Sequence, residues 1–195
     1  MVNKAELLEA IAGKNRGLLA TETDKVAILA EVSRLEEHNP TPRPLEATDL
    51  LEGNWRLLYT TSKGILNLGQ IPPLPLGQIY QCIRTSTSRI YNIAEVAELP
   101  YLESLVSVVA RFEPVSDIRV NVKFERSIVG SRRLIGYKSP SDFIQQIEAG
   151  KKFFPALDFS IESRDQSGWL DITYLDKDLR IGRGNEGNVF VLTKG

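Results

Sequence analysis

From about residue 50 onward, short apolar runs with a period of two follow one another closely, and this pattern most constrains the fold. In the run at 53–61, Trp55, Leu57 and Tyr59 occupy alternate positions. Such alternation is typical of strands with one buried face. The predicted strands cover residues 53–61, 78–84, 89–96, 105–112, 119–126, 132–137, 157–163, 169–175, 179–183 and 188–192.

The connections between these runs are short. Residues 176–178 and 184–187 read as tight turns, and no run is followed by a long helical crossover. Closely spaced strands with short turns indicate an antiparallel meander, sandwich or barrel rather than a parallel α/β sheet. We favour a closed barrel, because closure removes the exposed strand edges that promote aggregation.

The first part of the chain has a different period. Apolar residues at helical spacing predict two short helices over residues 3–12 and 24–37, with a capping box formed by Thr21 and Asp24. Three prolines at 40, 42 and 44 then stop the helix. We therefore expect a helical segment and proline-rich linker over 1–44, and a β-barrel domain over 45–195. A helical insertion over 139–149 is amphipathic, and we expect it to plug one end of the barrel.

Composition excludes several classes of function. The 24 basic and 25 acidic residues nearly balance, so no general attraction to nucleic acid follows. His38 and Cys82 are the only histidine and cysteine, too few for a structural zinc site or a disulfide within the chain. A Ser-His-Asp triad would have to use His38. We expect no metal, no cofactor and no catalytic residue, and hence a protein that is not an enzyme.

A barrel of about eight strands leaves room for one small ligand. Strand alternation gives the candidate inward-facing, ligand-binding side chains. These are Trp55, Leu57, Tyr59, Val122, Phe124, Phe159, Ile172, Tyr174 and Phe190. The alternative is that these side chains fill the interior and leave no cavity, and a slip of one residue in any strand would invert its face.

Polar residues cluster around the turn at 176–178. Asp176, Arg180 and Arg183 are candidates for a polar anchor that binds a ligand head group, or for closure of the barrel. The alternative is an ion-paired hairpin end. Arg180 or Arg183 is also placed to stack on Trp55 in a cation–π contact, which favours a structural role for Trp55 at the barrel bottom.

Two further segments carry apolar residues outside the regular pattern. Residues 63–76 are rich in glycine, proline and leucine, which suggests a lid, a contact surface, or side chains packed on the barrel end. Lys151-Lys152-Phe153-Phe154 combines basic and aromatic residues in the manner of a peripheral membrane contact. The longest apolar stretches, such as 105–110, are far shorter than a membrane span.

Two stretches resemble a known family. Gly53-Asn54-Trp55-Arg56-Leu57-Leu58-Tyr59-Thr60 is similar to the opening G-x-W-x-L-L-Y-T of the plastid-lipid-associated protein (fibrillin, or plastoglobulin) family. Residues 169–192, with Thr173-Tyr174-Leu175-Asp176 and Leu179-Arg180-Ile181, resemble its closing block. The proline hinge after a helical pair is also similar, so the resemblance covers essentially the whole chain.

The resemblance implies a lipocalin-like barrel that binds isoprenoid or related lipids at thylakoid membranes or lipid globules. The suggested ligands are prenylquinones, carotenoids and fatty acids. An alternative role is that of a scaffold which assists a polyprenyl diphosphate synthase in plastoquinone biosynthesis. The chain starts without a transit peptide, so we expect a cyanobacterial homologue that is cytoplasmic or peripheral to the thylakoid membrane.

Overall fold

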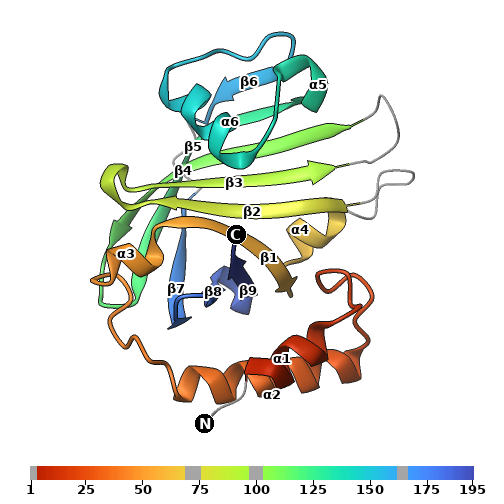
Figure 1. The fold of residues 1–195 in the computed structure, drawn as a ribbon, viewed down its shortest axis with the longest axis vertical. Helices are drawn as coiled ribbons and strands as arrows, with labels where there is room; N and C mark the ends of the chain where they lie inside the picture. Colours follow the sequence, from red (N-terminus) through yellow and green to blue (C-terminus); the bar gives the residue numbers. More distant parts are fainter. Residues whose placement is uncertain (1–3, 69–75, 97–102, 162–166) are drawn as a thin grey trace.

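A computed structural model of the chain describes residues 4–68, 76–96, 103–161 and 167–195. The fold is mainly β, with nine strands in one antiparallel sheet (Figure 1). The strands are β1 (Gly53–Thr60), β2 (Leu76–Arg84), β3 (Arg89–Val96), β4 (Ser104–Pro114), β5 (Arg119–Ser131), β6 (Leu157–Ser160), β7 (Ser167–Leu175), β8 (Leu179–Gly184) and β9 (Val189–Lys194). The helices are α1 (Lys4–Ile11), α2 (Glu22–Glu37), α3 (Thr48–Leu51), α4 (Lys63–Leu68), α5 (Arg132–Ile135) and α6 (Pro140–Glu148).

Eight of the strands close into a barrel. Their order is β4-β3-β2-β1-β9-β8-β7-β5, and β5 pairs with β4 to complete the ring. The long strand β5 pairs with β7 over its first residues and with β6 beyond them, so β6 extends the sheet outside the ring. The expected lipocalin-like antiparallel barrel is confirmed.

The barrel is closed at one end by Trp55 and α3. The Trp55 indole is fully buried, and its Nε1 donates a hydrogen bond of 2.9 Å to the carbonyl oxygen of Leu51. The guanidinium of Arg180 lies 5.3 Å and the Lys194 ammonium 5.2 Å from the ring centroid. The structure thus selects Arg180 for the cation–π contact, which is worth about 0.5–2 kcal/mol depending on burial.

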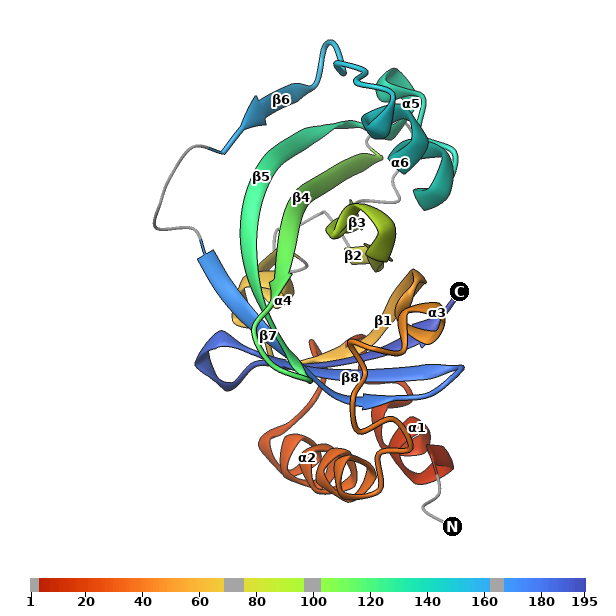
Figure 2. The same ribbon diagram turned by 90° about the vertical axis from the view of Figure 1, so that its left-hand side faces the viewer.

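Helices α1 and α2 lie against the outer face of the barrel, over β8 and β9 (Figure 2). The capping box of α2 is confirmed: the Thr21 side chain accepts from the amide of Asp24, and the Asp24 carboxylate accepts from the Thr21 amide at 2.9 Å. The apolar residues Leu7, Ile28 and Val32 are fully buried there. This interface therefore forms a second core outside the barrel.

Helix α6 does not plug the barrel, and that prediction is wrong. Its apolar face, formed by Phe143, Ile144 and Ile147, packs on the outer face of β2–β5 in a third core that includes Cys82. Burial in this core raises the pKa of the Cys82 thiol to about 12. The amphipathic pattern identified the helix, but an amphipathic face fits the outside of a sheet as well as the end of a barrel.

The predicted strand over 132–137 is also wrong. Strand β5 continues to Ser131, and the chain then forms the short helix α5, which ends at Gly136 with a positive φ of 73°. A glycine adopts this left-handed conformation without steric cost, so it terminates the helix in a common way. The run over 132–137 is too short for its apolar pattern to distinguish a strand from one helical turn.

Candidate functional site

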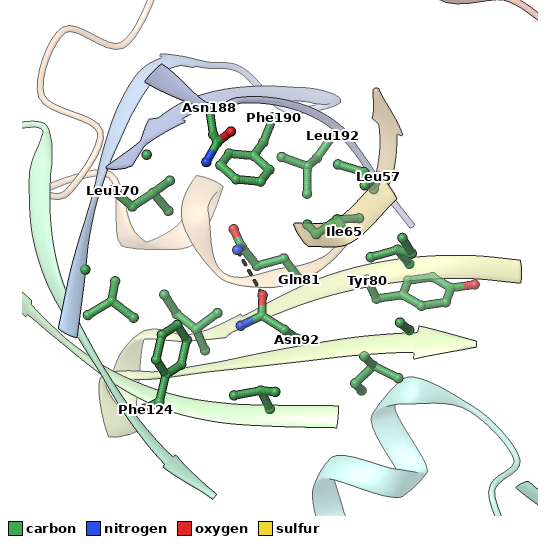
Figure 3. A pocket seen from close by; sticks show the side chains of 18 of the residues that line it. Leu57, Ile65, Tyr80, Gln81, Asn92, Phe124, Leu170, Asn188, Phe190 and Leu192 are labelled. Atoms are coloured by element: carbon green, nitrogen blue, oxygen red, sulfur yellow. Dashed lines mark hydrogen bonds between the residues drawn. The ribbon is translucent and has the colours of Figure 1, made fainter. Parts of the chain in front are cut away.

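The barrel encloses a cavity of about 510 Å³ that is lined mainly by apolar side chains (Figure 3). Phe190 and Leu192 of β9 lie on one wall with Leu57 of β1, and Phe124 of β5 lies across the cavity from them. Ile65 of α4 also lines it. The side chains of the barrel therefore do not fill its interior. Cavities of this size with apolar walls are typical of sites for small organic ligands.

Glycine residues on β8 help to leave this space open. Alternation on β8 directs Arg180, Gly182 and Gly184 inward, because Leu179 and Ile181 pack into the outer core with α2. A Cβ on Gly184 would lie 3.2 Å from the Phe190 ring. Strand β8 therefore contributes one long side chain near the closed end and no side chain beside the cavity.

A polar pair lies in this apolar interior, on the side of the cavity that faces Arg180. Gln81 of β2 and Asn92 of β3 face each other in register, and Gln81 Nε2 donates to Asn92 Oδ1 at 3.1 Å (Figure 3). Gln81 Oε1 accepts from Nη2 of the fully buried Arg180. We refer to Gln81, Asn92 and Arg180 as the polar floor. Among the lining residues that the structure describes, Tyr80 is the only titratable one, and burial raises its pKa.

Four of the predicted ligand-binding residues line the cavity, and two lie deeper. Leu57, Val122, Phe124 and Phe190 are in the wall. Trp55 and Ile172 belong to the core at the closed end. Their inward orientation agrees with the alternation.

Tyr59 and Tyr174 point the other way, so their predicted inward orientation is wrong. Both belong to the outer core under α1 and α2. A β-bulge interrupts β1 between Leu57 and Tyr59, and another interrupts β7 between Ile172 and Tyr174. An extra residue in a strand reverses the face of every residue after it.

Phe159 is on the cavity-facing side of the sheet but does not line the cavity among the described residues. It pairs with Ser127, which pairs with the lining residue Val108, and directly paired side chains share a face. Strand β6 lies beyond the ring, and the Phe159 side chain is 53% exposed. The alternation gave the correct face, but it could not show that this strand leaves the barrel.

The polar cluster of the 176–183 segment is divided between the two sides of the barrel wall. Asp176 accepts from Lys4 Nζ and from the Tyr174 hydroxyl, both at 2.8 Å, which joins α1 to the turn. Arg183 donates to both carboxylate oxygens of Glu36 at 2.8 and 2.7 Å and thereby holds α2. Only Arg180 faces the interior, so the structure offers one candidate for an anchor beneath a ligand.

Sequence reasoning missed Gln81 and Asn92. A signal was present, because each occupies an inward position between apolar residues: Gln81 between Ile79 and Ile83, and Asn92 between Ile90 and Ala94. A polar side chain at an inward position of a strand needs a hydrogen-bond partner. The register of β2 and β3 supplies that partner, but the sequence alone does not fix the register.

On the outside of β5, helix α5 meets the segment between α6 and β6 (Figure 1). Gly130 allows this meeting, since a Cβ there would lie only 2.7 Å from Ala156 Cβ and 3.4 Å from Ile135 Cγ2. Phe154 is 91% exposed, and Leu134 is also exposed. The segment 132–155 contains five basic and two acidic residues. We call the exposed residues Arg133, Leu134, Lys138, Lys151, Lys152 and Phe154 the basic apolar surface.

The remaining expectations concern loops, metals and membranes. No strand forms over 63–68, where α4 lies, and residues 69–75 of the predicted loop lie outside the described residues. The described residues contain no group of three or more His, Cys, Asp or Glu side chains arranged to hold a metal ion. In the same part of the chain, none of the helices is both long and apolar enough to cross a bilayer.

Comparison with known proteins identifies several relatives of this chain. The chain is 33% identical over 217 residues to a light-induced chloroplastic protein of Solanum tuberosum, covering 98% of this chain and 66% of that protein. It is 32% identical over 216 residues to a chloroplastic plastid-lipid-associated protein of Citrus unshiu, and equally to a chromoplast-specific carotenoid-associated protein of Cucumis sativus, covering 98% of this chain and 67% of each.

The chain therefore spans about two thirds of the length of these curated relatives. No solved structure gives a significant match. The PAP_fibrillin family model matches residues 1–193, which is nearly the whole chain. The resemblance seen in the opening and closing blocks is thereby confirmed, and the chain belongs to the PAP_fibrillin family.

Proposed function

We propose that this protein is a non-enzymatic carrier that holds one hydrophobic molecule inside the barrel. The observation that carries the proposal is the cavity of about 510 Å³ with apolar walls in a closed barrel. Each Å² of apolar surface removed from water contributes about 25 cal/mol before the costs of association. An apolar chain seated between the walls would thus bind without any covalent or metal contact.

The names of the relatives support this class of ligand. Relatives at about one third identity are named as lipid-associated and carotenoid-associated proteins. We propose a prenylquinone, a carotenoid or a fatty acid as the cargo, carried at thylakoid membranes or lipid globules and serving the maintenance of photosynthetic membranes. The mainly apolar lining suits the storage or transfer of such a molecule.

We propose that the basic apolar surface makes the peripheral membrane contact that such a carrier needs. Lysine and arginine side chains bind anionic head groups, and an exposed phenylalanine beside them enters the boundary of the acyl chains. Phe154 follows directly after Lys151, Lys152 and the buried Phe153. Burial of Phe153 fixes the position of its neighbours, so that Phe154 is presented outward.

Binding of a neutral fluorescent probe, N-phenyl-1-naphthylamine, tests the carrier proposal. We expect one saturable site per chain. Val108→Trp fills the cavity from β4 and should weaken probe affinity about tenfold or more, equivalent to a loss of about 1.4 kcal/mol. The control is Val26→Trp, the same change at an α2 position that is 72% exposed, and it should bind as the wild type does.

The alternative role is a scaffold that assists a polyprenyl diphosphate synthase in plastoquinone biosynthesis. That role would use the outer surface and not the cavity. Folded Val108→Trp protein that has lost probe binding but still supports plastoquinone synthesis in the host would favour the scaffold and contradict the carrier. Loss of probe binding together with loss of function would favour the carrier.

A further inference from the structure

Arg180 has an unusual environment for a charged side chain. It is fully buried, and its Nη2 donates one hydrogen bond, to Gln81 Oε1. Within the part of the chain that the structure describes, its Nε and Nη1 have no hydrogen-bond partner. Among the described residues, no carboxylate forms an ion pair with it; the ion pairs of Asp176 and Arg183 lie on the outer side of the wall. A buried charge normally has a counter-ion, so this guanidinium lacks the usual compensation.

The charge on Arg180 nevertheless persists at neutral pH. Burial lowers the pKa of the guanidinium to about 9, which is still above neutrality. The Trp55 ring at 5.3 Å stabilises the cation through its π face, but a ring supplies no hydrogen-bond acceptor for Nε and Nη1. The closed end of the barrel therefore carries a positive charge that none of the described residues neutralises.

This charge lies directly beneath the cavity. Gln81, its hydrogen-bond partner, lines the cavity. Ile90 and Leu170 line both the cavity and a small void of about 10 Å³ next to Arg180. In such a low-dielectric interior the field of a charge extends further than in water. The bottom of the cavity is thus at positive potential, while its walls are apolar.

The two amides above Arg180 are oriented by it. Gln81 Oε1 is engaged by the guanidinium, and Gln81 Nε2 donates to Asn92 Oδ1. Asn92 Nδ2 has no hydrogen-bond partner within the described part of the chain, and Asn92 lines the cavity. The chain of hydrogen bonds therefore ends in a donor that faces the ligand. A donor over a buried cation favours an acceptor that carries negative charge.

We propose that the cavity selects a single-chain lipid with a carboxylate head group, bound head-first against Asn92 and Gln81 with its chain between Phe124 and Phe190. The inference rests on the proposed carrier function and names the class of ligand for that site. A carboxylate compensates the charge of Arg180 through the Gln81 amide and accepts from Asn92 Nδ2. A pure hydrocarbon would leave both groups uncompensated.

Three probes of equal chain length isolate the head group. Dodecanoate, 1-dodecanol and dodecylamine are each used to displace N-phenyl-1-naphthylamine from the delipidated protein at neutral pH. We expect dodecanoate to bind about tenfold or more tightly than the alcohol, the range that a charge-assisted hydrogen bond contributes. Dodecylamine should bind more weakly than the alcohol, because its ammonium meets the charge of Arg180.

The variant Gln81→Glu tests the preference for a carboxylate head group, because it changes the charge of the side chain but hardly its shape. Its carboxylate accepts from Arg180 as the amide oxygen does now, and it cancels the positive charge of the floor. We expect the affinity for dodecanoate to fall about tenfold or more, while that for 1-dodecanol stays within about threefold. The control is Gln145→Glu, the same substitution at an exposed position of α6. Arg180→Met is a second variant and should remove the preference, with thermal unfolding as the check on its fold.

Equal affinity of the wild type for dodecanoate and 1-dodecanol would overturn the proposal and leave the carrier function intact. So would a preference that survives in both Gln81→Glu and folded Arg180→Met. If neither the fluorescent probe nor any of the three chains binds, the carrier proposal itself fails, and the head-group selection fails with it.

Discussion

At the scale of single residues, the buried ion pair between Arg126 and Asp158 fixes the segment that carries the basic apolar surface. Arg126 donates to both Asp158 carboxylate oxygens, at 2.8 and 2.6 Å, and to the carbonyl oxygen of Lys151 at 2.7 Å. The Asp158 side chain is 5% exposed. Hydrogen bonds from Arg126, and then one from the Phe153 amide, outweigh the effect of burial and lower the pKa of Asp158.

A lowered carboxylate pKa means that the group stabilises the fold above its unfolded pKa, near 4, and that this stabilisation is lost as the pH falls through the lowered value. We expect Asp158→Asn to lower the free energy of unfolding by about 1.5–3 kcal/mol at pH 7. The difference between variant and wild type should disappear as the pH falls below the lowered pKa. Urea unfolding at a series of pH values measures this, and a difference that does not depend on pH would contradict the assignment.

At the scale of secondary-structure elements, α2 is attached to the barrel by packing and by one polar clamp. Glu36 accepts from Arg183 and, at 2.6 Å, from the Thr173 hydroxyl. Only a small part of the Glu36 side chain is exposed, so these bonds are weakened less by solvent than those of a surface pair. The clamp therefore connects α2 to both β7 and β8.

We expect Glu36→Gln to reduce the free energy of unfolding by about 1–2 kcal/mol, since Arg183 then loses its charged partner. The control is Glu31→Gln on the same helix, which removes only a surface pair with Arg34 and should change stability by less than about 0.5 kcal/mol. Chemical denaturation of both variants measures this. Equal effects of the two substitutions would show that Arg183 is not a clamp.

The individual strands also show how much of the fold and of the site could be predicted from the sequence. Alternation identified the strands, the barrel and the wall residues Leu57, Val122, Phe124 and Phe190, because each run keeps its period over several residues. It failed after a bulge: Tyr59 and Tyr174 lie on the outer face, since an inserted residue leaves no mark in the apolar pattern. The polar floor depends on which strands become neighbours, and the pairing of Gln81 with Asn92 is a property of the closed sheet.

At the scale of the whole molecule, exposed apolar residues lie at two opposite ends. The basic apolar surface with Phe154 lies near α5 and α6, while Val26 is exposed on α2 at the other end (Figure 1). Basic residues accompany Phe154, and the first turn of α2 before Val26 is acidic. Both surfaces expose apolar side chains, but their charge differs: the surface with Phe154 is basic, and the one with Val26 is next to acidic residues.

We expect Phe154→Asp to lower binding to vesicles containing anionic phosphatidylglycerol about tenfold or more. The reason is the loss of one aromatic side chain that the bilayer would remove from water. Binding should also weaken as salt is added, because screening reduces the attraction of Lys151 and Lys152 to the head groups. Co-sedimentation with the vesicles measures both. Val26→Asp should leave binding unchanged. An equal loss for the two variants would contradict the assignment of this surface.

The proposed carrier function requires that the barrel hold a hydrophobic molecule in its cavity. Organic extraction and mass spectrometry of the wild-type protein and of Val108→Trp, purified in parallel from the native host, test it most directly. We expect one lipid molecule per chain in the wild type and its loss from the folded variant. Equal lipid content in the two proteins, or an empty wild type, would contradict it.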